Sequence, residues 1–220
     1  MAAGDMRVRV WDLPVRLFHW GIVALVIAAW ATQYVNRMGA HRICGYSVFA
    51  ALLFRLIWGF VGSDTARFSH FLRSPAAALA RLRYFTRLDT GEEIGHNAAG
   101  GWMVILMLVL LAIQVGTGLC ATNDVDFAGP FSDWVGQDCS DTLTTVHSWN
   151  FTVIEAAIAV HVLAVIAYHV VRRQNLVGPM ITGVKRMRVP PRTPRMASAW
   201  LALAVAASAG IVVGFVVTWP

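Results

Sequence analysis

The segment that decides the fold is Thr145–Val171, TVHSWNFTVIEAAIAVHVLAVIAYHVV, which contains one acidic residue and neither Lys nor Arg. An apolar helix of about 20 residues crosses the hydrocarbon core of a bilayer, so this segment is predicted to be a transmembrane helix. His147 and His161 are 14 residues apart in it. Fourteen residues make almost four helical turns, which places both side chains on nearly the same face, roughly 21 Å apart along the axis.

The composition of the whole chain points to the same solvent. Of its 220 residues, 57% are hydrophobic and only 14% are charged. Soluble domains usually carry about 25% charged residues, so lipid is the expected main solvent. The net charge of +6 does not indicate nucleic acid, because the basic residues stand at the ends of apolar runs rather than in a stripe with exposed aromatics.

Four further segments are long and apolar enough to span the membrane. The expected spans are 17–35, 41–61, 96–119, 145–171 and 197–218. The first is too long for the apolar core of a signal peptide, and no small-residue cleavage site follows it. The predicted fold class is therefore all-α: an integral membrane helical bundle with a four-helix core in residues 1–188. A proline-rich linker and a fifth transmembrane helix occupy residues 189–220.

The positions of Lys and Arg predict the orientation, because basic loops remain in the cytoplasm. With the N-terminus inside, fifteen of the eighteen basic residues fall on the cytoplasmic side. Only Arg37 and Arg42 lie outside, and Arg55 falls within the second span. The C-terminus is then expected on the outer side of the membrane.

Two loops have distinctive compositions under this assignment. The outer loop before the fourth span has no Lys or Arg and contains five acidic residues: Asp124, Asp126, Asp133, Asp138 and Asp141. In the inner loop, residues 75–85 are predicted to form a short amphipathic helix at the headgroup level. The chain has three cysteines but no CxxC or CxxCH motif, so neither zinc nor covalent haem attachment is indicated. Sequence leaves open whether Cys120 and Cys139 form a disulfide or remain thiols.

Ionisable groups inside membrane spans are costly, so each histidine there is a functional candidate. One metal cannot bind both His147 and His161 at that separation, so each needs a partner from another helix. Matching depths predict the pairs His41–His147 near the outer surface and His19–His161 toward the inside. Such pairs fit two haem irons held by bis-histidine ligation, which favours one-electron transfer without an open site for oxygen.

Other polar residues near the spans admit more than one role. His96 has a depth similar to that of His19 and could replace either inner ligand. Alternatively, His96 and His169 could make interfacial hydrogen bonds or contact a haem propionate or a quinone headgroup. Arg55, 14 residues after His41, and Arg16, one turn before His19, are candidate partners of a propionate. Long basic side chains can also extend to the interface instead.

Several motifs resemble one known family. The segment Val10–Trp20, VWDLPVRLFHW, resembles the opening of bacterial b-type cytochromes of the b561 and nickel–iron hydrogenase subunit superfamily. Residues 41–46 and 54–59 are similar to its second helix. Residues 95–97 are similar to the start of its third, although the family often has Pro at the position of Ala98. Residues 175–183 resemble the tail motif of the free-standing electron-transfer branch. The resemblance covers about residues 7–188.

This resemblance implies a four-helix core, two b haems per chain and a quinone-linked redox function. The matching ligand positions are His19, His41, His147 and His161. The leading hypothesis is electron transfer between the quinone pool and a periplasmic redox protein such as a c-type cytochrome, with no catalytic residue of its own. The acidic outer loop favours a basic partner. The alternatives are a superoxide oxidase that reduces quinone and the membrane cytochrome b subunit of a hydrogenase or dehydrogenase. A homodimer is compatible with each of these functions.

Overall fold

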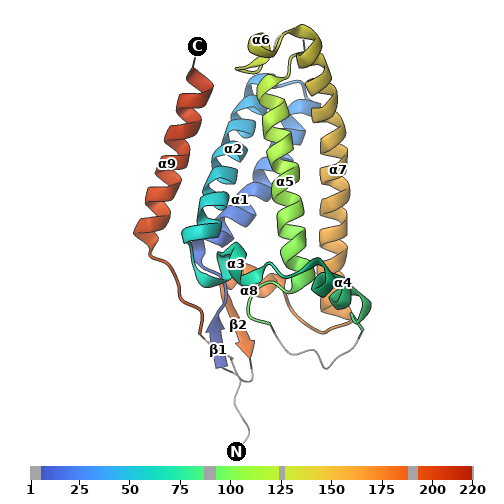
Figure 1. The fold of residues 1–220 in the computed structure, drawn as a ribbon, viewed down its shortest axis with the longest axis vertical. Coiled ribbons are helices and arrows are strands. Elements are labelled where there is room, and N and C mark those ends of the chain that lie inside the picture. The colour runs from blue at the N-terminus through green and yellow to red at the C-terminus, as the bar shows by residue number, and fades with distance from the viewer. Residues whose placement is uncertain (1–5, 87–92, 124–126, 188–192, 220) are drawn as a thin grey trace, which may run out of the picture. The chain divides into compact units, whose positions relative to one another are not determined.

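The computed structural model in Figure 1 describes residues 6–86, 93–123, 127–187 and 193–219. Within these ranges the chain is mainly helical. Five helices are long and apolar enough to cross a membrane: α1 Leu13–Tyr34, α2 Met38–Val61, α5 Ala98–Cys120, α7 Gln137–Val170 and α9 Ala199–Thr218. The five predicted spans are confirmed, and the chain is a multi-pass membrane protein.

The surfaces of these helices fit a lipid solvent. Ile27 of α1, Leu163 of α7 and Ile211 of α9 are all exposed in the isolated chain. Large apolar side chains of this kind are buried in a soluble protein, whereas lipid tails cover them in a bilayer. Along α9, Val205, Ala209 and Val213 are buried at four-residue spacing, which gives the fifth helix one packing face.

All five helix starts differ from their predicted positions, by two to eight residues, and the largest difference is at α7. Helix α7 begins at Gln137, well before Thr145, because its polar first turns are bonded to the end of α5 and to the loop that follows it. Ser140 Oγ donates to the Cys120 carbonyl at 2.6 Å, and Thr144 Oγ1 donates to that of Thr122 at 3.0 Å. Hydropathy alone does not detect such an extension.

Helix α5 begins at Ala98, so His96 lies in the preceding loop and not in the helix where it was expected. Asn97 provides the start, since its Oδ1 accepts the Gly100 amide at 2.8 Å and its carbonyl accepts the Gly101 amide. Asparagine is a favoured residue at this capping position.

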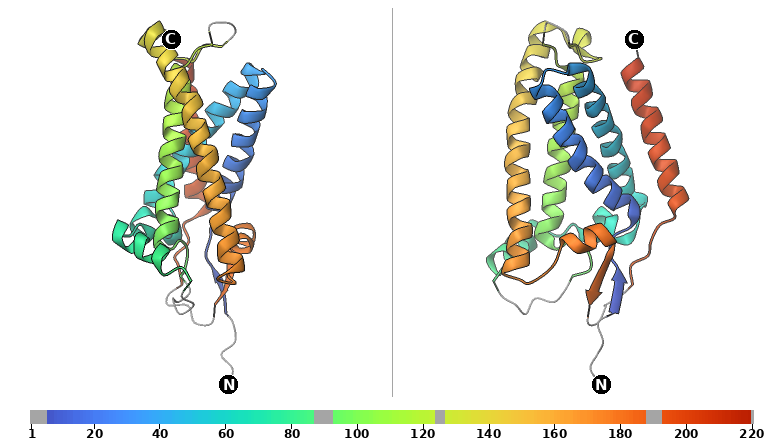
Figure 2. Two further views of the ribbon diagram at one scale, coloured as in Figure 1. Left: turned by 90° about the vertical axis from the view of Figure 1, so that its right-hand side faces the viewer. Right: turned by 180° about the vertical axis from the view of Figure 1, so that it is seen from behind.

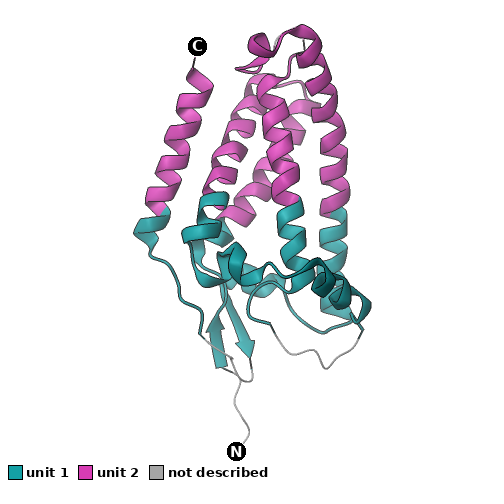
Figure 3. Cartoon of the chain, viewed as in Figure 1, with its two compact units in different colours: residues 1–17, 56–106, 159–202 teal, residues 18–55, 107–158, 203–220 magenta. Residues whose placement is uncertain are grey.

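The chain divides into two compact units, coloured in Figure 3. Unit 1 comprises Met1–Leu17, Leu56–Leu106 and Ala159–Ala202, and unit 2 comprises Phe18–Arg55, Met107–Ile158 and Leu203–Pro220. Each long helix contributes residues to both units. Unit 2 also contains the one-turn helix α6, Ser132–Val135. Asp124 and Asp126 of the acidic loop lie outside the described residues.

Unit 1 contains a small sheet that sequence reasoning missed. Strand β1, Met6–Arg9, pairs antiparallel with β2, Val184–Met187, and the two arrows lie side by side in Figures 1 and 2. Val8 and Met187 are buried in it. Helix α8, Val177–Thr182, precedes β2 and ends at Gly183, whose φ of 82° requires a residue without a side chain. The Gly183 carbonyl accepts the Val10 and Trp11 amides, which joins the start of α1 to this turn.

Short helices make up the rest of unit 1. They are η1 Asp64–Ala66, α3 Phe68–Phe71 and α4 Pro75–Arg83. The helix predicted for residues 75–85 is confirmed as α4, with Ser74 accepting the Ala77 amide and Pro75 in the first turn. His70 belongs to α3.

The segment before α9 is bonded to the residues that follow α2. Backbone and side-chain bonds join Arg195 to Asp64, and the Ala197 amide donates to Ser63 Oγ at 2.9 Å. Pro190, Pro191 and Arg192 of the predicted linker lie outside the described residues. The division into residues 1–188 and 189–220 remains a sequence-based interpretation.

Candidate haem-binding site

His41 and His147 lie together in unit 2. His41 is in the first turn of α2, and His147 is three turns into α7. Their ring centroids are 6.2 Å apart, with the ring planes at 78°. Two histidines from different transmembrane helices thus meet inside one compact unit.

The proton position on the His41 ring follows from its hydrogen bond. Nδ1 lies 2.8 Å from the Ala29 carbonyl oxygen of α1. A carbonyl oxygen only accepts, so Nδ1 carries the proton and Nε2 keeps its lone pair. A backbone carbonyl on the second ring nitrogen is the usual way in which a protein orients a metal-binding histidine.

The His147 ring is oriented in the same way by α5. Its Nδ1 lies 2.9 Å from the Gln114 carbonyl oxygen and 3.2 Å from Thr117 Oγ1. The Thr117 hydroxyl donates to the Ile113 carbonyl at 2.7 Å, so it can accept from His147. Nδ1 is therefore the protonated nitrogen here too, and Nε2 is the nitrogen that carries the lone pair.

The Gln114 side chain contacts the other ring nitrogen of His147. Gln114 Nε2 is 3.0 Å from His147 Nε2, and its Oε1 accepts from Asn150 Nδ2 at 2.7 Å. Asn150 is buried, and it also donates to the Leu110 carbonyl at 2.9 Å. This chain of three side chains holds the His147 ring from α5 and from its own helix.

Gly118 lets the His147 ring approach the backbone of α5. A Cβ at position 118 would lie 2.8 Å from His147 Cε1, closer than real Cβ atoms come to another atom. At Gly116, two residues earlier on the same helix, a Cβ would meet nothing within 4 Å. Gly118 therefore leaves the space that the His147 imidazole occupies, whereas a side chain at position 116 would not meet the ring.

These residues fit the axial ligation of a b-type haem. Both rings present an unprotonated Nε2, and both are fixed through Nδ1 by backbone carbonyls. Their separation is too large for direct contact and leaves room for two metal–nitrogen bonds, each about 2.0 Å long. The Gln114 amide occupies the same lone pair on His147, so a metal would replace that hydrogen bond. A bound haem would supply reversible one-electron chemistry at this position.

The other predicted ligands belong to different units. His19 is half-buried on α1 in unit 2, with its ring edge-on to Trp20 at 4.9 Å. His161 is half-buried on α7 in unit 1. Their pairing therefore rests on the sequence spacing alone.

His96 has an aromatic environment in unit 1. Its ring lies 4.6 Å from Trp11 and 4.8 Å from Phe71, measured between centroids. Gly95 precedes it with φ of 88°, and the space there is limited by Thr65 and Trp11. His169, at the end of α7, is exposed.

The two arginines proposed as propionate partners differ in their surroundings. Arg55 of α2 is only 3% exposed. Arg16 of α1 donates from Nη1 to the Ile181 carbonyl at 2.6 Å, and its buried Nε has no partner among the described residues. Arg16 thus retains an N–H group suited to a carboxylate.

Sequence reasoning missed four residues that position His147: Gln114, Thr117, Gly118 and Asn150. A signal was present, because Gln114 and Asn150 are strongly polar within apolar spans. The three on α5 also recur at helical spacing.

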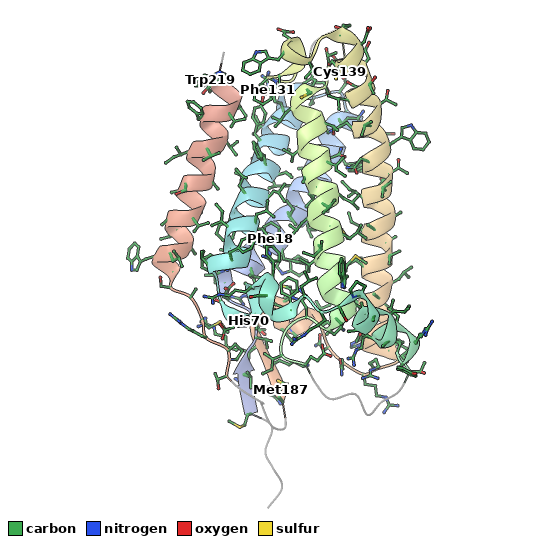
Figure 4. All side chains as sticks on the ribbon, in the orientation of Figure 1. Phe18, His70, Phe131, Cys139, Met187 and Trp219 are labelled. Atoms are coloured by element: carbon green, nitrogen blue, oxygen red, sulfur yellow. The ribbon has the colours of Figure 1, made fainter. Side chains whose placement is uncertain are left out.

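All three cysteines are free thiols, and Cys139 is labelled at the start of α7 in Figure 4. The structure thus favours the thiols over a Cys120–Cys139 disulfide.

Five apolar helices and a pair of oriented imidazoles on two of them fit a membrane cytochrome of the b type. The family model described as prokaryotic cytochrome b561 matches residues 10–183, and the chain belongs to that family. Membership implies b-type haem and is consistent with electron transfer in a membrane.

Curated relatives carry a related description. The chain is similar to a "Probable Ni/Fe-hydrogenase B-type cytochrome subunit" of Bradyrhizobium diazoefficiens, with 22% identity over 85% of this chain and 89% of the relative. Proteins of the same description from Cupriavidus necator and Azotobacter vinelandii are 22% and 25% identical. These matches cover 81% and 80% of this chain, and 87% of each relative. No solved structure matches the chain at a significant level.

Proposed function

We propose that the chain carries electrons across a bacterial inner membrane through two b haems, one held by His41 and His147 and the other by His19 and His161. The observation that carries this proposal is the shared orientation of the first pair. Each ring donates from Nδ1 to a backbone carbonyl, at 2.8 Å for His41 and 2.9 Å for His147. Both Nε2 lone pairs are thereby available to one metal.

The second haem is supported by the spacing of histidines along the sequence. His161 follows His147 by almost four turns of the same helix, and His19 has a matching depth on α1. The alternative inner ligand, His96, is packed against Trp11 and Phe71, so its ring already has a structural role. Arg55 and Arg16 are the proposed partners of haem propionates, since a cation within a membrane span is stabilised by a negatively charged group.

The proposed membrane topology places the N-terminus in the cytoplasm and the C-terminus in the periplasm. The distribution of Lys and Arg supports this topology. The His41–His147 haem is then near the periplasm, and the His19–His161 haem is nearer the cytoplasm. Asp133, Asp138 and Asp141 are exposed on α6 and the first turns of α7, next to the periplasmic haem in this topology.

These acidic residues favour a basic redox partner, because complementary charge accelerates encounter. A c-type cytochrome with a basic haem edge has the required chemistry. The membrane quinone pool is the proposed second partner, reached from within the lipid. The chain itself then acts as an electron carrier between the two.

The test uses the haem-loaded protein in proteoliposomes. A quinol is expected to reduce both haems, and added oxidised c-type cytochrome is expected to reoxidise them. Stopped-flow reoxidation should slow markedly between about 10 mM and 0.2 M salt, because screening shortens the range of the attraction. Haems that no quinol reduces would reject quinone as a partner. A reoxidation rate that does not depend on salt would reject the basic c-type cytochrome.

A second candidate function has support from the relatives. Proteins named as probable Ni/Fe-hydrogenase B-type cytochrome subunits align with most of this chain. A hydrogenase would then deliver electrons to these haems in place of a diffusing partner. Purification of the tagged chain from its native membranes tests this: a co-purifying nickel–iron protein and haem reduction by hydrogen gas would assign the subunit role.

A further inference from the structure

Unit 1 contains a half-open cavity of about 580 Å³ that is separate from the His41–His147 pair. Its walls come from α3, α4, the loop before α5 and the first residue of α5. The polar residues that line it are His70, Arg73, Arg81, Tyr84, Glu93 and His96. His70 is labelled on α3 in Figure 4.

The cavity is cationic. Arg73 and Arg81 contribute two positive charges and Glu93 one negative charge. Arg81 Nη1 is 3.9 Å from Glu93 Oε1, a long ion pair that leaves most of the five guanidinium N–H donors available. The Arg81 side chain is only 13% exposed, so its charge is held inside the cavity. Among the described residues, the Arg73 guanidinium has no hydrogen-bond partner.

The position of the cavity corresponds to the headgroup layer of a bilayer. Ala98 lines it and is also the first residue of the transmembrane helix α5. One turn further on, Trp102 Nε1 donates to the Arg73 carbonyl at 3.0 Å, and tryptophan is enriched at membrane interfaces. On α4, Leu79 and Leu82 are exposed on the face opposite the residues that line the cavity, as expected for a helix that rests on the acyl boundary.

We propose that this cavity binds the phosphate group of an anionic phospholipid. Guanidinium groups match the geometry and charge of phosphate, and imidazole and phenol groups add donors. A volume of about 580 Å³ is within the range of ligand pockets. The exposed Leu79 and Leu82 place α4 at the acyl boundary, which brings the cavity to the level of lipid headgroups and favours a lipid phosphate over a free phosphate. A quinone headgroup is neutral and gives no reason for two arginines in one cavity. This inference does not depend on the proposed electron-transfer partners.

The test is native mass spectrometry of the full-length, haem-loaded protein with phosphatidylglycerol and phosphatidylcholine of identical acyl chains. The wild type is expected to prefer phosphatidylglycerol by about tenfold, and the R73Q/R81Q variant to lose that preference. Unchanged haem content in the variant shows that it is folded. No preference in the wild type, or an undiminished preference in the variant, would overturn the proposal.

A matched control separates this cavity from general attraction to a basic helix. Arg83 lies on the same helix, α4, but outside the cavity lining. Arg83→Gln is expected to leave the lipid preference within about twofold of the wild type. An equal loss in Arg83→Gln would reject the cavity as the site. Displacement of phosphatidylglycerol by millimolar inorganic phosphate would assign it to free phosphate, and displacement by a short-chain quinone would assign it to quinone.

Discussion

The Gln114 carbonyl accepts a hydrogen bond from His147 Nδ1 at 2.9 Å, while the side-chain amide of the same Gln114 lies 3.0 Å from His147 Nε2. One residue thus contacts both nitrogens of a histidine on a neighbouring helix. The backbone contact fixes the tautomer, and the side-chain contact marks the nitrogen that is free to bind a metal. This relationship makes the orientation of the ring a property of α5 as well as of α7.

Replacing Thr117 by valine is expected to raise the potential of one haem. The Thr117 hydroxyl accepts from His147 Nδ1, and such acceptors make the imidazole a more basic ligand that favours oxidised iron. A neutral hydrogen bond contributes about 1 kcal/mol, so the rise is at most roughly 40 mV in a one-electron titration. Thr145→Val is the control, because Thr145 is exposed and its hydroxyl donates to the Asp141 carbonyl at 3.0 Å. Equal potentials in Thr117→Val and the wild type would remove Thr117 from the site.

Adding one methyl group at Gly118 is expected to displace the His147 ring. Gly118→Ala should lower the haem-to-chain ratio from about two toward about one, since the new Cβ would lie 2.8 Å from Cε1. Gly116→Ala is the matched control, because it makes the same substitution on the same helix with the same gain in helix propensity. It should keep both haems. Pyridine haemochrome assays of the two variants give the comparison. A full haem content in Gly118→Ala would show that the contact is not needed.

These residues also show where sequence reasoning reached its limit. The spans, and the depths of His41 and His147, follow from hydropathy and helix periodicity, which are local properties. The contact of His147 with Gln114 and Gly118 depends on how two helices are rotated against each other, which no single span encodes. The β1–β2 pairing joins Met6 to Met187 across most of the chain, so local patterns could not predict it. The start of α7 at Gln137 depends on bonds from Ser140 and Thr144 to the end of α5 and the loop that follows it.

Replacing Arg55 by leucine is expected to lower the potential of one haem. Arg55 is 3% exposed and lies 14 residues after His41 on α2, so its charge acts in a region of low dielectric constant. A nearby cation stabilises the reduced haem, and its loss favours the oxidised form. Arg55→Lys keeps the charge and should shift the potential less. Unchanged potentials for both haems in Arg55→Leu would exclude Arg55 from the haem environment.

Asp12 is expected to matter for stability rather than for redox chemistry. Its buried carboxylate accepts from Trp58 Nε1 at 3.0 Å and from the Val15 amide at 2.7 Å, which joins α1 to the end of α2 within unit 1. Asp12→Ala leaves both donors buried without this acceptor and should cost about 1–3 kcal/mol for each unsatisfied group. Thermal unfolding in detergent should show a lower midpoint, whereas Asp133→Ala, at an exposed position, should behave as the wild type. A midpoint unchanged by Asp12→Ala would contradict this role.

The central claim is that two haems are held by two separate histidine pairs, and haem counting across single-histidine variants tests it most directly. The purified wild type should contain about two b haems per chain in a reduced-minus-oxidised spectrum with haemochrome quantification. His41→Ala and His147→Ala should each lose the same haem, and His19→Ala and His161→Ala should each lose the other. His169→Ala, at an exposed position on α7, should lose neither. A wild type with one haem per chain, or His41→Ala and His147→Ala variants that keep both, would contradict the account.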